Sequence, residues 1–127
     1  MSEITDINWL ATIVGFALSF GLGMLWFSPK MFGKKWAEGV GINPDSPDKP
    51  PAGAMIAQAI GTFLLAWVVA VTAKNEALFT IILITLTMVF LAGASAFFTG
   101  KNAYARHTEA GFTVSMVVIM IICQAII

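Results

Sequence analysis

The chain is short, strongly apolar and electrically neutral: it has 127 residues, of which 58% are hydrophobic and 11% charged, and its formal net charge is zero. Soluble domains carry about a quarter charged residues, so this composition excludes an ordinary water-exposed globular surface. The lack of net positive charge also excludes the basic field of a nucleic-acid-binding protein. The sequence therefore predicts a lipid bilayer as the main partner and no nucleic acid.

Four apolar runs are each about as long as a helix that crosses a membrane. They contain no Asp, Glu, Lys, Arg or His and cover residues 7–27, 54–73, 77–98 and 110–127. A spanning helix needs about 20 predominantly apolar residues, whereas soluble amphipathic helices show a polar stripe at helical spacing. The sequence thus predicts an all-α membrane protein, a bundle of four transmembrane helices that forms one domain over residues 1–127.

The predicted loop 28–53 begins with a second, shorter helical pattern. Over residues 30–40, aromatic and other apolar side chains share one side of a helix and lysines the other. This pattern is typical of a helix in the membrane interface, where lysines meet anionic headgroups. A partner-docking or ligand-gating element is the alternative. The predicted interfacial anchor consists of Trp26, Phe32, Lys34, Lys35 and Trp36.

Basic residues indicate how the bundle is oriented. Six of the seven Lys and Arg residues fall in the predicted loops 28–53 and 99–109, and only Lys74 lies in the short connection between the second and third spans. By the positive-inside rule, the two basic loops face the cytoplasm. Both termini are then expected outside.

Small residues at four-residue spacing predict where the spans pack. Helices in lipid associate by close approach of their backbones at Gly, Ala and Ser. The first span and the second each carry such a ridge. The predicted helix-packing residues are Gly15, Ser19, Gly23, Ala57 and Gly61.

Uncharged polar side chains in the spans are the candidates for lining a solute path. The amides of Gln58 and Gln124 are expected to form interhelical hydrogen bonds, with contact to a substrate as the alternative. Together with two hydroxyl side chains they make the candidate polar lining: Gln58, Thr62, Ser95 and Gln124.

The sequence carries no pattern for catalysis, for a cofactor or for a metal. Functional sites inside membranes are usually marked by ionisable groups, and the four spans have none. The chain has one histidine, His107, and one cysteine, Cys123, and neither has metal-ligand spacing to other residues. We expect no enzyme and no cofactor; an enzyme acting on lipid through His107 and Glu109 is a third-ranked alternative.

The first half of the chain carries a recognisable motif. Residues 8–11 read N-W-L-A, residues 23–29 read G-M-L-W-F-S-P and residues 31–36 read M-F-G-K-K-W. This series resembles the bacterial membrane family called domain of unknown function 1761, and the similarity extends over nearly the whole chain. Phe27 stands where the family commonly has tyrosine. The resemblance implies a four-span protein of the bacterial inner (plasma) membrane and implies no activity.

The two halves of the chain have similar span ends. An aromatic residue followed by Gly-Lys occurs at 32–34 and, with one residue inserted, at 98–101. This suggests two parallel helical hairpins related by an axis along the membrane normal; chance similarity is the alternative, because aromatic and basic residues are common at membrane exits.

Two hypotheses for function follow. The first is a non-enzymatic membrane protein that assembles with itself, or that serves as an accessory subunit of a larger membrane complex. The second is an oligomeric small-molecule transporter or channel, with its path between subunits, because four spans of this length rarely enclose a path alone.

Overall fold

The structure is a computed structural model that describes residues 5–28, 31–41 and 52–127. This part of the chain is helical and contains no strand. The helices are α2 (Trp9–Trp26), α3 (Gly33–Val40), α4 (Ala52–Lys74), α5 (Leu78–Phe98) and α6 (Ala103–Ile126). All but α3 are long and apolar enough to cross a membrane. The predicted fold, four spans with a short helix after the first, is confirmed.

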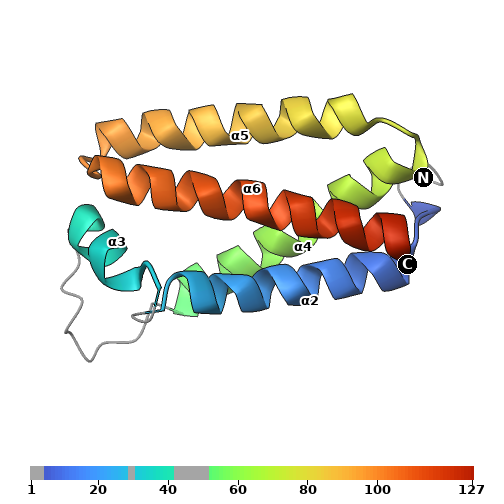
Figure 1. The fold of residues 1–127 in the computed structure, drawn as a ribbon, viewed down its shortest axis with the longest axis horizontal. Coiled ribbons are helices and arrows are strands. Elements are labelled where there is room, and N and C mark those ends of the chain that lie inside the picture. The colour runs from blue at the N-terminus through green and yellow to red at the C-terminus, as the bar shows by residue number, and fades with distance from the viewer. Residues whose placement is uncertain (1–4, 29–30, 42–51) are drawn as a thin grey trace.

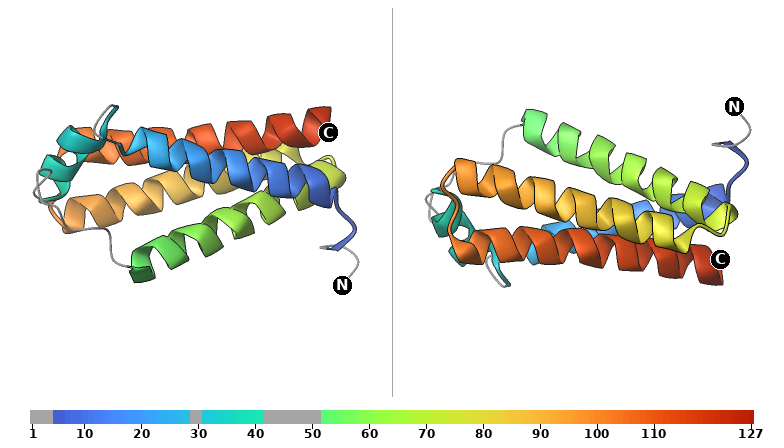
Figure 2. Two further views of the ribbon diagram at one scale, coloured as in Figure 1. Left: turned by 90° about the horizontal axis from the view of Figure 1, so that it is seen from below. Right: turned by 90° about the horizontal axis from the view of Figure 1, so that it is seen from above.

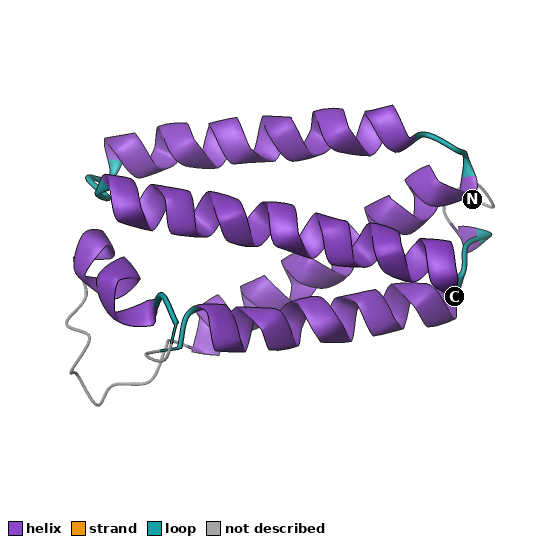
Figure 3. Ribbon diagram, viewed as in Figure 1, coloured by secondary structure: helices purple, strands orange, loops and turns teal. Residues whose placement is uncertain are grey.

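The four long helices alternate in direction along the bundle (Figures 1 and 3). The start of α2, the α4–α5 turn and the end of α6 lie together, and we call this the terminal end. The short helix α3 and the α5–α6 connection lie at the opposite end, which we call the α3 end. Helix α6 contacts all the others, whereas α5 packs mainly against α4 and α6. Helix α6 is therefore the central element of the bundle.

Two asparagines set where helices begin. The Asn8 side chain accepts a hydrogen bond from the backbone N–H of Ala11 (3.1 Å) and so caps α2. The Asn102 side chain caps α6 in the same way, accepting from Ala105 (2.9 Å). These bonds satisfy backbone donors that a helix leaves free at its start.

The last span begins earlier than predicted. The loop predicted over residues 99–109 is helical from Ala103, because the Asn102 cap lies before a polar segment that continues directly into the apolar run. The predicted loop 28–53 contains α3, as expected, and its residues 42–51 lie outside the described part of the chain.

Helix α4 diverges from the rest of the bundle. Figure 2 shows its first half leaning away from α5 and α6 toward the α3 end. In this half, over residues 53–61, every residue except Ala59 is exposed. The second half instead contributes Ala66, Val69 and Ala70 to the buried interior. Helix α4 is thus held mainly near the terminal end.

The interior is apolar, and so is the outer surface. The core joins residues of α4 and α5 to one face of α6: Ala66, Val69, Ile81, Phe112, Met116, Val117 and Met120. Large apolar side chains also cover the outside; Phe79 is 85% and Phe98 is 92% exposed. A surface of this kind is stable in lipid rather than in water. The described helices therefore indicate a protein embedded in a membrane.

Candidate functional site

Two tryptophans fix the motif region to the start of α6. The indole N–H of Trp26, at the end of α2, donates to the carbonyl oxygen of Thr108 (3.0 Å). The indole N–H of Trp36, on α3, donates to the carboxylate of Glu109 (2.9 Å). Both bonds join segments more than 70 residues apart in sequence. The first span and α3 are therefore held by the same turn of α6.

An aromatic cluster packs behind these hydrogen bonds. The ring of Trp26 lies 4.8 Å from that of Phe32, and the ring of Phe27 lies 4.8 Å from that of Trp36. Phe27 also meets Phe112 of α6 edge to face, at 5.2 Å between centroids. Such contacts add to area burial, by about 0.5–1.5 kcal/mol per pair. Trp26, Phe32 and Trp36 of the predicted anchor thus lie, with Phe27 and Phe112, in one cluster that extends from the end of α2 to α6.

Glu109 is the polar centre of this region. Its carboxylate receives both the Trp36 indole and the ammonium group of Lys101, whose Nζ lies 2.9 and 3.0 Å from the two carboxylate oxygens. The side chains of this ion pair are only about a quarter exposed, 27% for Lys101 and 25% for Glu109. Sequence reasoning did not assign Glu109 to the anchor. In the sequence, Glu109 is distinguished only as an acidic residue directly before an apolar run.

Two glycines of α3, Gly33 in the motif and Gly39 beyond it, are required by close approach of neighbouring atoms. A Cβ at Gly33 would overlap the carbonyl oxygen of Phe27 and the backbone of Ser28. A Cβ at Gly39 would overlap the side chain of Asn102, whose backbone N–H donates to the Gly39 carbonyl (3.0 Å). Helix α3 can therefore lie against the turn before it and the start of α6 only with glycine at both positions.

The lysines of the predicted anchor lie on the outside of α3. Lys34 and Lys35 are exposed, and Lys35 Nζ lies 5.6 Å from the centre of the Tyr104 ring. Beside them is a shallow hollow of about 250 Å³, lined by Trp26, Phe32, Tyr104, His107 and Thr108. The α3 end thus presents both basic and aromatic groups.

The small-residue ridge of the first span lies inside the helix bundle. Ser19 is fully buried, and a Cβ at Gly15 would lie 3.5 Å from the Cα of Met120 on α6. A Cβ at Gly23 would approach the ring of Phe112 to 2.9 Å. This ridge therefore provides the close approach of α2 to α6.

The small-residue ridge of the second span faces outward. Ala57 and Gly61 are exposed, and a methyl group added at Gly61 would meet no described atom of a neighbouring helix within 4 Å. Gln58 lies exposed between them; its amide N–H donates to the hydroxyl of the buried Thr62 (3.2 Å). We call this surface, formed by Ala54, Ala57, Gln58 and Gly61, the open face of α4.

The four candidate lining residues do not come together within the described chain. Gln58 and Thr62 are hydrogen-bonded in the first half of α4, and Ser95 is exposed on α5. Gln124 lies at the terminal end of α6, where its amide N–H donates to the hydroxyl of Thr12 (3.2 Å). No single path through the described subunit is lined by all four.

The side chains considered for catalysis or metal binding do not form one site. His107 is exposed, Cys123 is buried with a free thiol, and Glu109 is bonded to Lys101 and Trp36. Within residues 5–28, 31–41 and 52–127, no three His, Cys, Asp or Glu side chains are grouped as metal ligands would be.

One known protein family matches this chain. The model of a family described as "Protein of unknown function (DUF1761)" matches residues 10–127, nearly the whole chain. The chain belongs to this family. No curated protein and no solved structure gave a match. In this DUF1761 protein, Trp26 and Trp36 of the motif join α2 and α3 to α6, and Gly23 lies against Phe112 of α6.

Proposed function

We propose that this DUF1761 protein is a non-enzymatic membrane protein that assembles with copies of itself through the open face of α4. The observation that carries the proposal is the exposed amide of Gln58 in an uncharged span, on the same face as Ala57 and Gly61. The Gln58 amide has one internal partner, the Thr62 hydroxyl, whereas lipid offers none for its remaining hydrogen-bonding groups, and small residues beside it allow a second backbone to approach.

The internal packing supports an intermolecular use of this face. The ridge of Gly15 and Ser19 is already covered by α6, so the subunit does not need Gly61 to fold. Two open faces meeting in the membrane let the Gln58 amides exchange hydrogen bonds, worth about 0.6–2 kcal/mol each. Since the same patch is used by both copies, the expected assembly is a symmetric dimer.

The α3 end is proposed to face the cytoplasm of a bacterial inner membrane, with both termini outside. Lys34 and Lys35 are exposed at this end, and Lys101 and Arg106 belong to it as well. The Trp36–Glu109 bond holds α3 where its lysines meet anionic headgroups, each contributing about 1 kcal/mol. On this proposal α3 anchors the assembly at the cytoplasmic surface.

A transport function would require the same assembly. Within one subunit the four candidate lining residues are dispersed, so a solute path could form only where copies meet, with Gln58 beside it. Self-assembly is therefore the function that the geometry supports best, and transport would be built on it.

Bulk added at Gly61 tests the proposal. Gly21 is a matched control, because it is also an exposed glycine of a span with open space around its Cβ position. Native mass spectrometry from detergent should show dimers for the wild type and for Gly21→Leu, and monomers for Gly61→Leu. Monomers in all three samples, or an unchanged dimer in Gly61→Leu, would contradict self-assembly through this face. A different chain bound in place of the second copy would instead favour the accessory role.

A further inference from the structure

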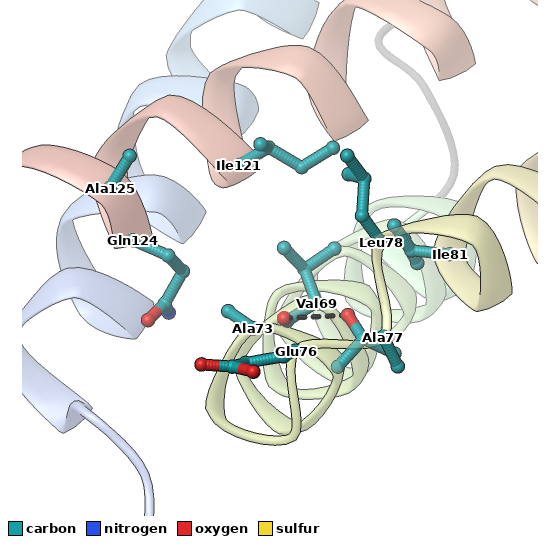
Figure 4. A pocket seen from close by; sticks show the side chains of 10 residues that line it. Val69, Ala73, Glu76, Ala77, Leu78, Ile81, Ile121, Gln124 and Ala125 are labelled. Carbon is teal, nitrogen blue, oxygen red and sulfur yellow. Dashed lines mark hydrogen bonds between the residues drawn. The ribbon is translucent and has the colours of Figure 1, made fainter.

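A cavity of about 370 Å³ lies at the terminal end, between the end of α4, the start of α5 and the last turns of α6 (Figure 4). Its apolar wall includes Val69, Leu78, Ile81 and Ile121. Its polar lining consists of Glu76 at the α4–α5 turn, Gln124 of α6 and Thr72, whose hydroxyl donates to the Val69 carbonyl (2.8 Å). An apolar cavity of this size with a few convergent polar groups is typical of a small-molecule site.

Glu76 and Gln124 both offer hydrogen-bond acceptors. One amide N–H of Gln124 donates to the hydroxyl of Thr12 (3.2 Å), so its carbonyl oxygen remains available as an acceptor beside the second N–H. The Glu76 carboxylate has no ion-pair or hydrogen-bond partner within the described residues; the neighbouring Lys74 pairs instead with Asp6 (3.9 Å). Two acceptors, one of them an anion, suit a ligand that carries N–H donors and a positive charge.

Glu76 also has a backbone conformation that glutamate rarely adopts. Its φ is +54°, in the left-handed region. It lies where α4 ends, with Ala77 N–H bonded to the Thr72 carbonyl (2.8 Å) and Glu76 N–H to that of Ala73 (3.3 Å). This pair of bonds defines a helix end at which glycine is the usual residue. Glutamate at this position does not favour the turn, which points to a use for its carboxylate.

We propose that this cavity binds a small organic cation with an apolar body, whose ammonium group contacts the Glu76 carboxylate and the Gln124 carbonyl. The apolar part of the ligand lies against Val69, Ile81 and Ile121. An anion would be repelled by Glu76. A calcium ion takes six to eight oxygen ligands, more than these two side chains provide. The cavity lies within one subunit and at the opposite end from the open face of α4, so this proposal does not depend on assembly.

The test uses the full chain in nanodiscs of neutral lipid, with 2-phenylethylammonium as the probe and 2-phenylethanol as its uncharged analogue. Binding is measured by isothermal titration calorimetry. Glu76→Gln should weaken binding of the ammonium probe by about tenfold or more, which is the loss expected for one charge-assisted hydrogen bond. It should leave binding of the alcohol unchanged. Gln124→Leu should also weaken the ammonium probe.

Two further variants separate binding from folding and from net charge. Glu76→Gly suits the left-handed turn, so it should unfold at or above the wild-type temperature while losing ammonium binding. Glu38→Gln removes an exposed carboxylate at the α3 end and should bind the probe as the wild type does. The proposal is overturned if Glu76→Gln binds the ammonium probe like the wild type, if the alcohol binds equally well, or if Glu38→Gln weakens binding as much as Glu76→Gln.

Discussion

At the scale of single residues, the close contact of α2 with α6 depends more on side-chain size than on side-chain polarity. Ser19 lies within this contact with no exposed surface, and its hydroxyl has no hydrogen-bond partner in the described part of the chain. Gly15 on the same ridge has no side chain at all. What the two residues share is that they let the helix backbones come close.

Replacing Ser19 with alanine should therefore not harm the fold. The free energy of unfolding is expected to rise by about 1 kcal/mol, because the change removes a buried polar atom without a partner and leaves the methylene in place. Ser19→Leu should unfold far more easily, because it forces α2 away from α6. Thermal unfolding in detergent, followed by circular dichroism, measures both. Ser95→Ala, at an exposed position, should behave as the wild type; a Ser19→Ala protein as unstable as Ser19→Leu would show that the hydroxyl is needed.

At the scale of elements, the position of α3 depends on contacts distant in sequence. Its eight residues cannot form a stable helix alone in water. It is held by the Trp36–Glu109 hydrogen bond, the Phe27–Trp36 ring contact and the close approach at Gly39. Phe27 and Trp36 of the motif thus take part in docking α3.

Replacing Trp36 with phenylalanine should loosen α3 selectively. The ring contact with Phe27 is kept, whereas the indole bond to the Glu109 carboxylate is lost, at about 1.5–3 kcal/mol for a bond to a charged group. Hydrogen–deuterium exchange of residues 33–40 should become faster, with exchange in α4 and α5 unchanged. The Trp9→Phe control alters the indole at the terminal end, which donates to Thr5, and should leave α3 protected. Equal protection of α3 in Trp36→Phe would contradict the docking role of the bond.

The elements also show how far sequence reasoning reaches. The four spans could be predicted because uncharged apolar runs of this length have few other stable structures. The start of α6 at Ala103 was missed, since residues 103–109 are too polar to read as part of a span. The partners of Trp36 and the divergence of α4 depend on residues far apart in the chain, and no local pattern encodes them. Gln58 was singled out, but only the structure shows that it lies exposed.

At the scale of the whole molecule, charge is distributed unequally between the two ends. Lys34 and Lys35 are exposed at the α3 end. At the terminal end Lys74 lies 3.9 Å from the carboxylate of Asp6, so even this cation is partly balanced. Positive charge in short loops is the main determinant of topology.

A reporter joined to the C-terminus tests the resulting orientation. With the terminal end outside, an alkaline phosphatase fusion expressed in a bacterium should be active, because the enzyme forms its disulfides only outside the cytoplasm. A green fluorescent protein fusion at the same place should be dark. The opposite pair of results would reverse the proposed orientation, and it would leave the fold and the cavity unaffected.

The central place of α6 in the bundle has a consequence for when the bundle can fold during synthesis. It follows α2, α3, α4 and α5 in sequence, yet it provides four of the seven residues of the buried core and binds both tryptophans at the α3 end. The earlier helices therefore enter the membrane before their main packing partner exists. Their buried faces remain in contact with lipid until α6 is translated and inserted, so the bundle can pack only after that step.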